Sequence, residues 1–363
     1  MVRKETLKRH RQSVVFGGNA VNGQRSKSLL GAAFATAMLA FAWAPLHAAP
    51  QIKSVEWLVY GPSLADGFQR PLGLAVDVER GILVVADTGR HRLVILDAKG
   101  RGRGTLACQV GAGALASCEP RAVAIGPRGR IYTLDALESE VEVLTPTGAR
   151  LARFDPCPSD TLQARPQCLA VGSSGRIYVG FGGEDAGYVV LDPKGRLLSS
   201  VGFMPDGPFE GPVSIAVSPD EDAIAVVDPK AERVVSVHGS DGRLRMAFGP
   251  HGEGDGTFSV AAHVAWGPGN TLWVTDQVRQ SISVFDSTGR YLGRIGGFGR
   301  GPGQFDYPIA CAFLAPDRVA VLERAGSRLQ VLDVEVGEAR EPQTGLASPG
   351  SGNAGTYSSA EVD

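Results

Sequence analysis

Histidines are the residues with the clearest catalytic chemistry in this chain, and they are few. Beyond residue 48 there are four, His91, His238, His251 and His263. A metal centre needs three or more donors that converge at about 2 Å, and no three of these histidines share one position of the repeats described below. Ser214 and His263 could form a nucleophile and its base, but we interpret them as two unrelated residues. We therefore expect no cofactor and no bound metal.

The five cysteines predict disulfides rather than a metal site. Nine residues lie between Cys108 and Cys118, and ten lie between Cys157 and Cys168. Zinc sites favour the spacing Cys-x-x-Cys, which is absent. In an oxidising compartment we expect the bonds Cys108–Cys118 and Cys157–Cys168 to close two equivalent loops. Cys311 is left over at an apolar position, where we expect a buried, inert thiol.

Charge and composition argue against a nucleic-acid partner. The 363 residues carry 36 basic and 38 acidic side chains, which gives a net charge of −2 and a pI near 6.3. Such a chain has no basic field that would hold a phosphate backbone. The 43% share of hydrophobic residues suits a globular protein, and 48 glycines with 23 prolines predict many turns.

The first 48 residues are typical of a signal peptide. A basic segment, Met1 to Lys27, precedes an uncharged apolar run from Leu29 to Trp43. These fifteen residues are fewer than the roughly 20 that span a bilayer, so we expect cleavage after Ala48. An uncleaved anchoring helix is the alternative. We expect the mature protein to be periplasmic or secreted, monomeric and without a transmembrane anchor, and to end in a flexible Gly/Ser-rich tail over residues 337–363.

An internal repeat is the strongest indication of the fold. Six copies of an apolar motif begin at positions separated by 49, 46, 46, 49 and 47 residues. The copies are Pro71–Val76, Pro120–Ile125, Pro166–Val171, Pro212–Val217, Ala261–Trp266 and Pro308–Phe313. Each copy continues with a second and a third apolar stretch, separated by turn residues. Short β-branched stretches bounded by turns predict strands.

A fourth stretch completes five of the copies. It follows glycine turns at Gly100, Gly148, Gly195, Gly242 and Gly289 and is missing from the sixth copy. The N-terminal sequence from Val55 matches it, so we expect residues 55 to 60 to pair with the strand around Arg328 to Leu332. The predicted fold is therefore all-β: a six-bladed β-propeller of four-stranded antiparallel blades over residues 49–336, closed by the N-terminal strand so that no sheet edge stays open.

The repeats resemble those of the NHL-repeat propellers of exported bacterial proteins. The resemblance covers residues 55 to 335 and rests on three segments, Val85–Leu93, Phe248–Phe258 and Gly297–Pro308. Family repeats tend to show Asp-x-x-Asn-x-Arg where this chain has Asp87 to Arg92, with Arg90 at the Asn position. An acidic residue and an arginine five positions later recur as Asp87/Arg92, Asp228/Arg233 and Glu323/Arg328. We expect these pairs to clamp hairpins through charge-assisted bonds, with a ligand-contacting rim as the alternative.

Some propellers that resemble this family are enzymes. Amidating lyases of similar architecture bind a metal through several histidines, and gluconolactonase-like propellers use a Glu, Asn and Asp set. The third position of each copy, expected at the channel mouth, is Gly73, Ala122, Cys168, Ser214, His263 or Ala310. Only His263 among them could be a metal ligand.

We therefore expect a non-enzymatic scaffold that binds a protein or another extracytoplasmic ligand. A metal-dependent lyase or lactonase is the alternative. Variable loops on a rigid scaffold suit recognition. The candidate ligand contacts are Arg90, His91, Arg121, Glu138, Glu184, Asp185, His263, Arg279, Phe298 and Arg300.

Overall fold

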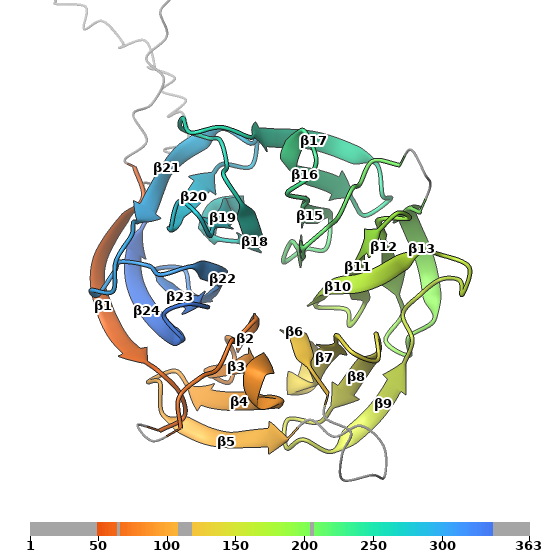
Figure 1. Ribbon diagram of the computed structural model, residues 1–363, viewed down its shortest axis with the longest axis horizontal. Coiled ribbons are helices and arrows are strands. Elements are labelled where there is room, and N and C mark those ends of the chain that lie inside the picture. Colours follow the sequence, from red (N-terminus) through yellow and green to blue (C-terminus); the bar gives the residue numbers. More distant parts are fainter. Residues whose placement is uncertain (1–48, 64–65, 108–117, 204–206, 337–363) are drawn as a thin grey trace, which may run out of the picture. The chain divides into compact units, whose positions relative to one another are not determined.

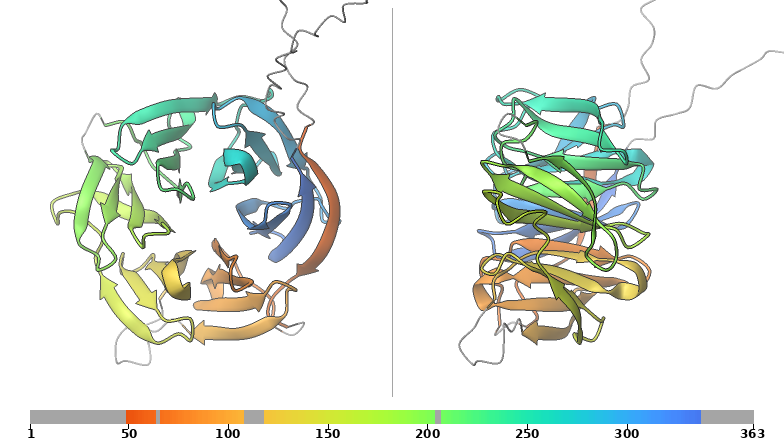
Figure 2. Two further views of the ribbon diagram at one scale, coloured as in Figure 1. Left: turned by 180° about the vertical axis from the view of Figure 1, so that it is seen from behind. Right: turned by 90° about the vertical axis from the view of Figure 1, so that its right-hand side faces the viewer.

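The computed structural model describes residues 49–63, 66–107, 118–203 and 207–336. Over these residues, the strands form six four-stranded antiparallel sheets around a central axis (Figure 1). Each sheet is one blade, and the strands nearest to the axis are β2, β6, β10, β14, β18 and β22 (Figures 1 and 2). The predicted six-bladed β-propeller is confirmed.

The blades follow one another along the chain. Blade one holds β2 (Gly73–Asp77), β3 (Ile82–Asp87), β4 (Arg92–Asp97) and β5 (Gly102–Ala107); blade two holds β6 (Pro120–Ile125), β7 (Ile131–Asp135), β8 (Val141–Leu144) and β9 (Arg150–Phe154); blade three holds β10 (Ala164–Val171), β11 (Ile177–Gly183), β12 (Gly187–Leu191) and β13 (Leu197–Gly202). Blade four holds β14 (Ser214–Val217), β15 (Ala223–Val227), β16 (Arg233–Gly239) and β17 (Leu244–Pro250); blade five holds β18 (Ala261–Trp266), β19 (Leu272–Asp276), β20 (Ser281–Phe285) and β21 (Tyr291–Gly296); blade six holds β22 (Pro308–Ala315), β23 (Arg318–Glu323), β24 (Arg328–Glu335) and β1 (Gln51–Val59). Single 3-10 turns lie at η1 (Thr88–Arg90), η2 (Pro127–Gly129) and η3 (Pro268–Asn270).

The N-terminal strand closes the ring in blade six, as predicted. In β1, Val55 pairs with Leu332, Trp57 with Val331 and Val59 with Leu329, all antiparallel on β24. The ladder is longer than expected, because it continues to Gln51 opposite Glu335. Trp57 also donates a hydrogen bond from Nε1 to the Ala98 carbonyl of blade one at 3.0 Å. The strand therefore joins the last blade to the first.

Neighbouring blades interlock near the outer rim through a side chain and a glycine. A large side chain of one blade lies against the turn glycine of the next blade. The pairs are Trp57 and Gly100, Leu106 and Gly148, Phe154 and Gly195, Val201 and Gly242, and Phe248 and Gly289. At these glycines φ lies between 74° and 89°, and an added Cβ would fall 2.5–2.8 Å from the facing side chain. Both the left-handed backbone and the close approach require glycine.

The acid that ends the second strand of a blade holds the loop before the inner strand of the same blade. In five blades its carboxylate accepts a hydrogen bond from a backbone N–H group of that loop at 2.6–3.1 Å. The acceptor and donor residues are Asp87 and Gln69, Asp135 and Glu119, Asp228 and Glu210, Asp276 and Ser259, and Glu323 and Asp306. In blade three Asp185 takes this role and accepts from the Gln163 N–H at 2.8 Å. A buried carboxylate is stable here because backbone donors satisfy it.

The predicted acid–arginine clamps are present in two of three places. Arg92 donates from Nε to Asp87 at 2.8 Å, and Arg328 donates from Nε to Glu323 at 2.7 Å. Asp228 instead accepts from backbone N–H groups, including Gly211 at 2.9 Å, and within the described chain no bond joins it to Arg233. The clamp prediction is wrong for blade four because Arg233 is exposed to solvent.

The predicted Cys157–Cys168 bond is wrong, because both residues are free thiols. Cys157 packs against the core between blades two and three, and its Sγ donates to the Ser159 carbonyl at 3.3 Å. Cys168 lies in the core between blades three and four, which is the opposite face of the sheet. Cys311 is free and buried, as predicted. Cys108 lies outside the described residues, so its bond to Cys118 stays a prediction.

Candidate functional site

The mouth of the central channel is a cavity of about 350 Å³ to which all six blades contribute. Its polar lining residues are Arg121, Gln167, Ser214, His263, Gln277 and Arg324. The remaining lining is apolar, as at Leu72, Ile309 and Val213. Arg121, Gln167, Ser214 and His263 lie on or next to inner strands, whereas Gln277 and Arg324 follow the acids that end β19 and β23. The same acid-held loops therefore shape the whole rim of the cavity.

Two arginines give this cavity its charge. Arg121 donates from Nε to the Gln167 carbonyl at 3.0 Å, which fixes the plane of its guanidinium. Burial lowers the pKa of Arg121, and the positive charge of Arg324 acts in the same direction. Arg121 nevertheless stays cationic, because a guanidinium is not deprotonated in proteins. No carboxylate lines the cavity among the described residues.

Ser214 and His263 line the same cavity without forming a nucleophile and its base. The Ser214 Oγ accepts a hydrogen bond from the Val264 N–H at 3.1 Å. His263 Nδ1 faces the Cys311 N–H at 3.5 Å, and in the part of the chain that is described no bond joins the two side chains. Burial lowers the pKa of His263 to about 4. The imidazole is therefore neutral near pH 7, with its proton on Nε2.

The structure places the other sequence candidates outside the cavity. Arg90 pairs with Asp66 at 3.0 Å, and Arg300 pairs with Asp306 at 3.0 Å while its side chain stays 80% exposed. Phe298 is 76% exposed on the loop between β21 and β22. His91 donates from Nδ1 to the Cys118 carbonyl at 2.8 Å, and Glu138 and Glu184 are exposed. Of the ten candidates, only Arg121 and His263 come together.

Two candidates are used within the fold. Arg279 donates to the carbonyls of Gly252 and Gly254 and to the hydroxyls of Thr257 and Ser259. It thereby holds the loop that connects blades four and five. Asp185 holds the loop before β10, as described above. Neither side chain is free to bind a ligand without loss of these bonds.

Three lining residues, Gln167, Gln277 and Arg324, were not among the candidate ligand contacts. Gln167 stands one position before the third residue of its copy, and Gln277 and Arg324 each follow the acid that ends a second strand. Pro229 occupies that same position in blade four and also lines the cavity. The repeat alignment therefore contained the signal, because the residue after the acid faces the channel in three successive blades.

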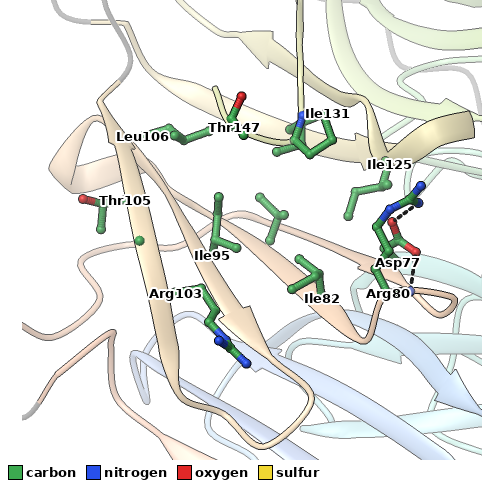
Figure 3. Close-up of a pocket in the computed structure, with 14 residues that line it drawn as sticks. Asp77, Arg80, Ile82, Ile95, Arg103, Thr105, Leu106, Ile125, Ile131 and Thr147 are labelled. Atoms are coloured by element: carbon green, nitrogen blue, oxygen red, sulfur yellow. Dashed lines mark hydrogen bonds and ion pairs between the residues drawn. The ribbon is translucent and has the colours of Figure 1, made fainter. Parts of the chain in front are cut away.

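A second cavity of about 510 Å³ lies between blades one and two (Figure 3). Ile82, Ile95, Ile125 and Ile131 surround it, and the Arg80–Asp77 ion pair lies at one end. An added Cβ at Gly104, in the outer strand β5, would meet no atom within 4 Å. The cavity exists in part because this position lacks a side chain.

The described residues contain no group of three or more His, Cys, Asp or Glu side chains placed to hold a metal ion. In the same residues no helix is long and apolar enough to cross a membrane.

The ring of six four-stranded blades defines the chain as a six-bladed β-propeller. The NHL repeat model matches residues 68–96, which run from the loop before β2 through most of β4. The match and the six blades together support an NHL-repeat β-propeller. No curated protein matches the chain.

Solved structures of similar fold include proteins of several activities. A calcium-binding protein, regucalcin, from Agrobacterium tumefaciens aligns over 80% of this chain and 97% of its own, with a TM-score of 0.57 and 16% identity. A gluconolactonase from Xanthomonas campestris aligns over 80% and 95%, with a TM-score of 0.58 and 17% identity. A streptogramin B lyase aligns over 77% and 98%, with a TM-score of 0.52 and 12% identity. At such identities the likeness extends to the fold alone.

Proposed function

We propose that this chain is an exported, non-enzymatic binding module that holds an extracytoplasmic ligand at the channel mouth and on the loops around it. The observation that carries the proposal is the lining of the mouth. It combines two arginines, two glutamines, a serine and a neutral histidine, and among the described residues it contains no carboxylate and no paired nucleophile and base. These groups can bind and orient a ligand, but the imidazole, with a pKa of about 4, is a weak general base near neutral pH. Export rests on the signal-peptide features of residues 1–48.

A metal-dependent lactonase or lyase is the second candidate, because the gluconolactonase and the streptogramin lyase share the fold. Calcium takes six to eight oxygen ligands, usually with carboxylates among them. This mouth offers the amide oxygens of Gln167 and Gln277 and the hydroxyl of Ser214, beside two arginines that repel a cation. The residues do not fit a calcium ion, so we derive no catalytic step through one.

Ligand capture from the native compartment tests the proposal. Immobilised protein is incubated with the exported fraction, and retained proteins and small molecules are identified by mass spectrometry. We expect the wild type to retain a ligand that the Arg121→Gln/Arg324→Gln variant loses. The matched control is Arg243→Gln, which changes an 89%-exposed arginine in the turn between β16 and β17.

Enzyme assays run on the same samples give the opposing result. We expect neither hydrolysis of gluconolactone nor cleavage of streptogramin above the uncatalysed rate in buffer, with or without added Ca²⁺. Turnover by the wild type that His263→Ala abolishes would contradict the proposal and support the enzyme.

A further inference from the structure

We propose that the channel mouth is a binding site for a small oxyanion, a molecule that presents a carboxylate or a phosphate group to Arg121 and Arg324. This inference rests on the proposed function, since it names the chemical class of the ligand. The inference goes beyond the proposed function because it assigns ligand recognition to two side chains at the channel mouth rather than to the outer loops. Neither the family match nor the solved structures assign such a site to this chain.

The first observation is that Arg121 lacks the carboxylate that other enclosed arginines have. Arg92 pairs with Asp87, and Arg328 pairs with Glu323. Arg121 makes one bond, from Nε to a carbonyl. Both of its Nη groups thus remain unbonded within the described chain, in a geometry that suits two parallel bonds to one oxyanion.

The second observation is the shared position of two like charges. Arg121 and Arg324 line one cavity of about 350 Å³, and each disfavours the charge of the other. Burial of the Arg121 guanidinium adds to this cost, as the lowered pKa shows. An anion between the two arginines would offset both effects, whereas a cation would increase them.

The third observation is that the other polar groups of the wall can donate hydrogen bonds. Gln167 and Gln277 carry amide N–H groups. The Ser214 Oγ accepts from Val264 and so keeps its own O–H to donate. Neutral His263 accepts at Nδ1 and so carries a proton on Nε2. The volume lies in the range of small-molecule pockets, which favours a small acid over a macromolecule.

Isothermal titration at low ionic strength tests the site with two probes, inorganic phosphate and citrate, and with chloride as the reference anion. We expect at least one oxyanion to bind with a stoichiometry of one, more tightly than chloride, and binding to weaken as salt is added. Removal of a charged hydrogen-bond partner costs about tenfold or more in affinity. We therefore expect Arg121→Gln and Arg324→Gln each to weaken binding by about that factor, and Arg121→Lys to weaken it less.

Two controls keep the result interpretable. Arg243→Gln removes one positive charge from the outer rim and should leave oxyanion affinity unchanged. Arg324 is exposed, so Arg324→Gln should fold even if Arg121→Gln does not, which circular dichroism checks.

Specific outcomes would overturn the inference. Binding of phosphate or citrate that neither arginine variant weakens would place the anion elsewhere. If the wild type binds neither probe but still captures a ligand from the exported fraction, the oxyanion site is wrong and the binding-module proposal stands. If oxyanions bind as expected and lactone turnover also appears, the site stands and the non-enzymatic proposal fails.

Discussion

At the scale of single residues, the side chains that shape the channel mouth differ from those that line it. Asp276 accepts backbone hydrogen bonds from Ser259 and Val260, and Arg279 bonds the loop before them. Arg121, His263 and Arg324 instead line the cavity, and the first two each make one bond to the backbone of a neighbouring inner strand. Changes to the first group should act on stability, whereas changes to the two arginines should act mainly on binding.

His263 should make the fold sensitive to acid. Its pKa is about 4 in the folded protein and about 6.5 in the unfolded chain, so between these values the unfolded state binds more protons. Stability therefore falls as the pH drops from about 6.5 towards about 4. Because cavity water screens part of the charge, we expect a loss on the order of 2 kcal/mol rather than the full value of the shift.

The variant His263→Asn isolates this effect, because its side-chain oxygen can still accept from the Cys311 N–H. Urea unfolding at about pH 7 and about pH 4.5 should show a smaller loss of stability for the variant than for the wild type. Equal losses would mean that other groups, such as His238, account for the acid sensitivity.

At the scale of elements, strand positions could be predicted from the sequence, but the face that each residue occupies could not. The second stretch of copy one, Ile82–Asp87, matches β3 residue for residue, because short β-branched runs bounded by turn residues favour strands. Cys168 follows a register shift after Pro166, and such a shift changes which face the next side chains occupy. The spacing from Cys157 carried no information on that shift, so the predicted bond failed.

The same limit applies to the functional residues. The bonds of Arg279 depend on the path of residues 252–259, which no repeat pattern encodes. Arg324 was predictable in principle, because its position after Glu323 matches that of Gln277 after Asp276. That its side chain lines the channel mouth, however, is a property of the three-dimensional ring.

The outer strand β5 is an element in which a substitution should raise the stability of the fold. Gly104 pairs with Ile95 next to the cavity between blades one and two (Figure 3). The equivalent residue of blade four is Met246, opposite Val237, and it packs into the core there. We expect Gly104→Ala to raise stability by about 0.5–1 kcal/mol, because alanine has a lower entropy cost in a strand, and Gly104→Met to add to this by filling the cavity.

Gly102, two residues earlier in β5, is the matched control. A Cβ at Gly102 would fall 2.7 Å from the Pro62 carbonyl oxygen, so Gly102→Ala should lower stability. Thermal unfolding of the three variants decides the matter. Equal shifts at both glycines would show that the cavity has no part in the effect.

At the scale of the whole molecule, the ring depends on a strand that is the most distant in sequence from its partners. Residues 51–59 pair with residues 329–335, so the first and last parts of the propeller must meet before blade six is complete. The contact also links blades, since Trp57 and Arg318 of blade six both donate to the Ala98 carbonyl of blade one. Loss of this strand should therefore affect the entire ring rather than one blade.

Removal of residues 49–62 should open the propeller at blade six. The backbone of β24 would become a free sheet edge next to Leu329 and Val331, which are fully buried in the intact ring, and such edges pair with other chains. We expect aggregation, measured by light scattering, and a loss of at least about 4 kcal/mol in any protein that stays soluble, given the apolar side chains removed. A synthetic peptide of residues 49–62, added in trans, should restore a monomer.

Removal of residues 337–363 is the control for this deletion. It should leave the melting temperature unchanged, because β24 ends at Glu335. A variant without residues 49–62 that remains monomeric and melts at the wild-type temperature would show that β1 does not close the ring.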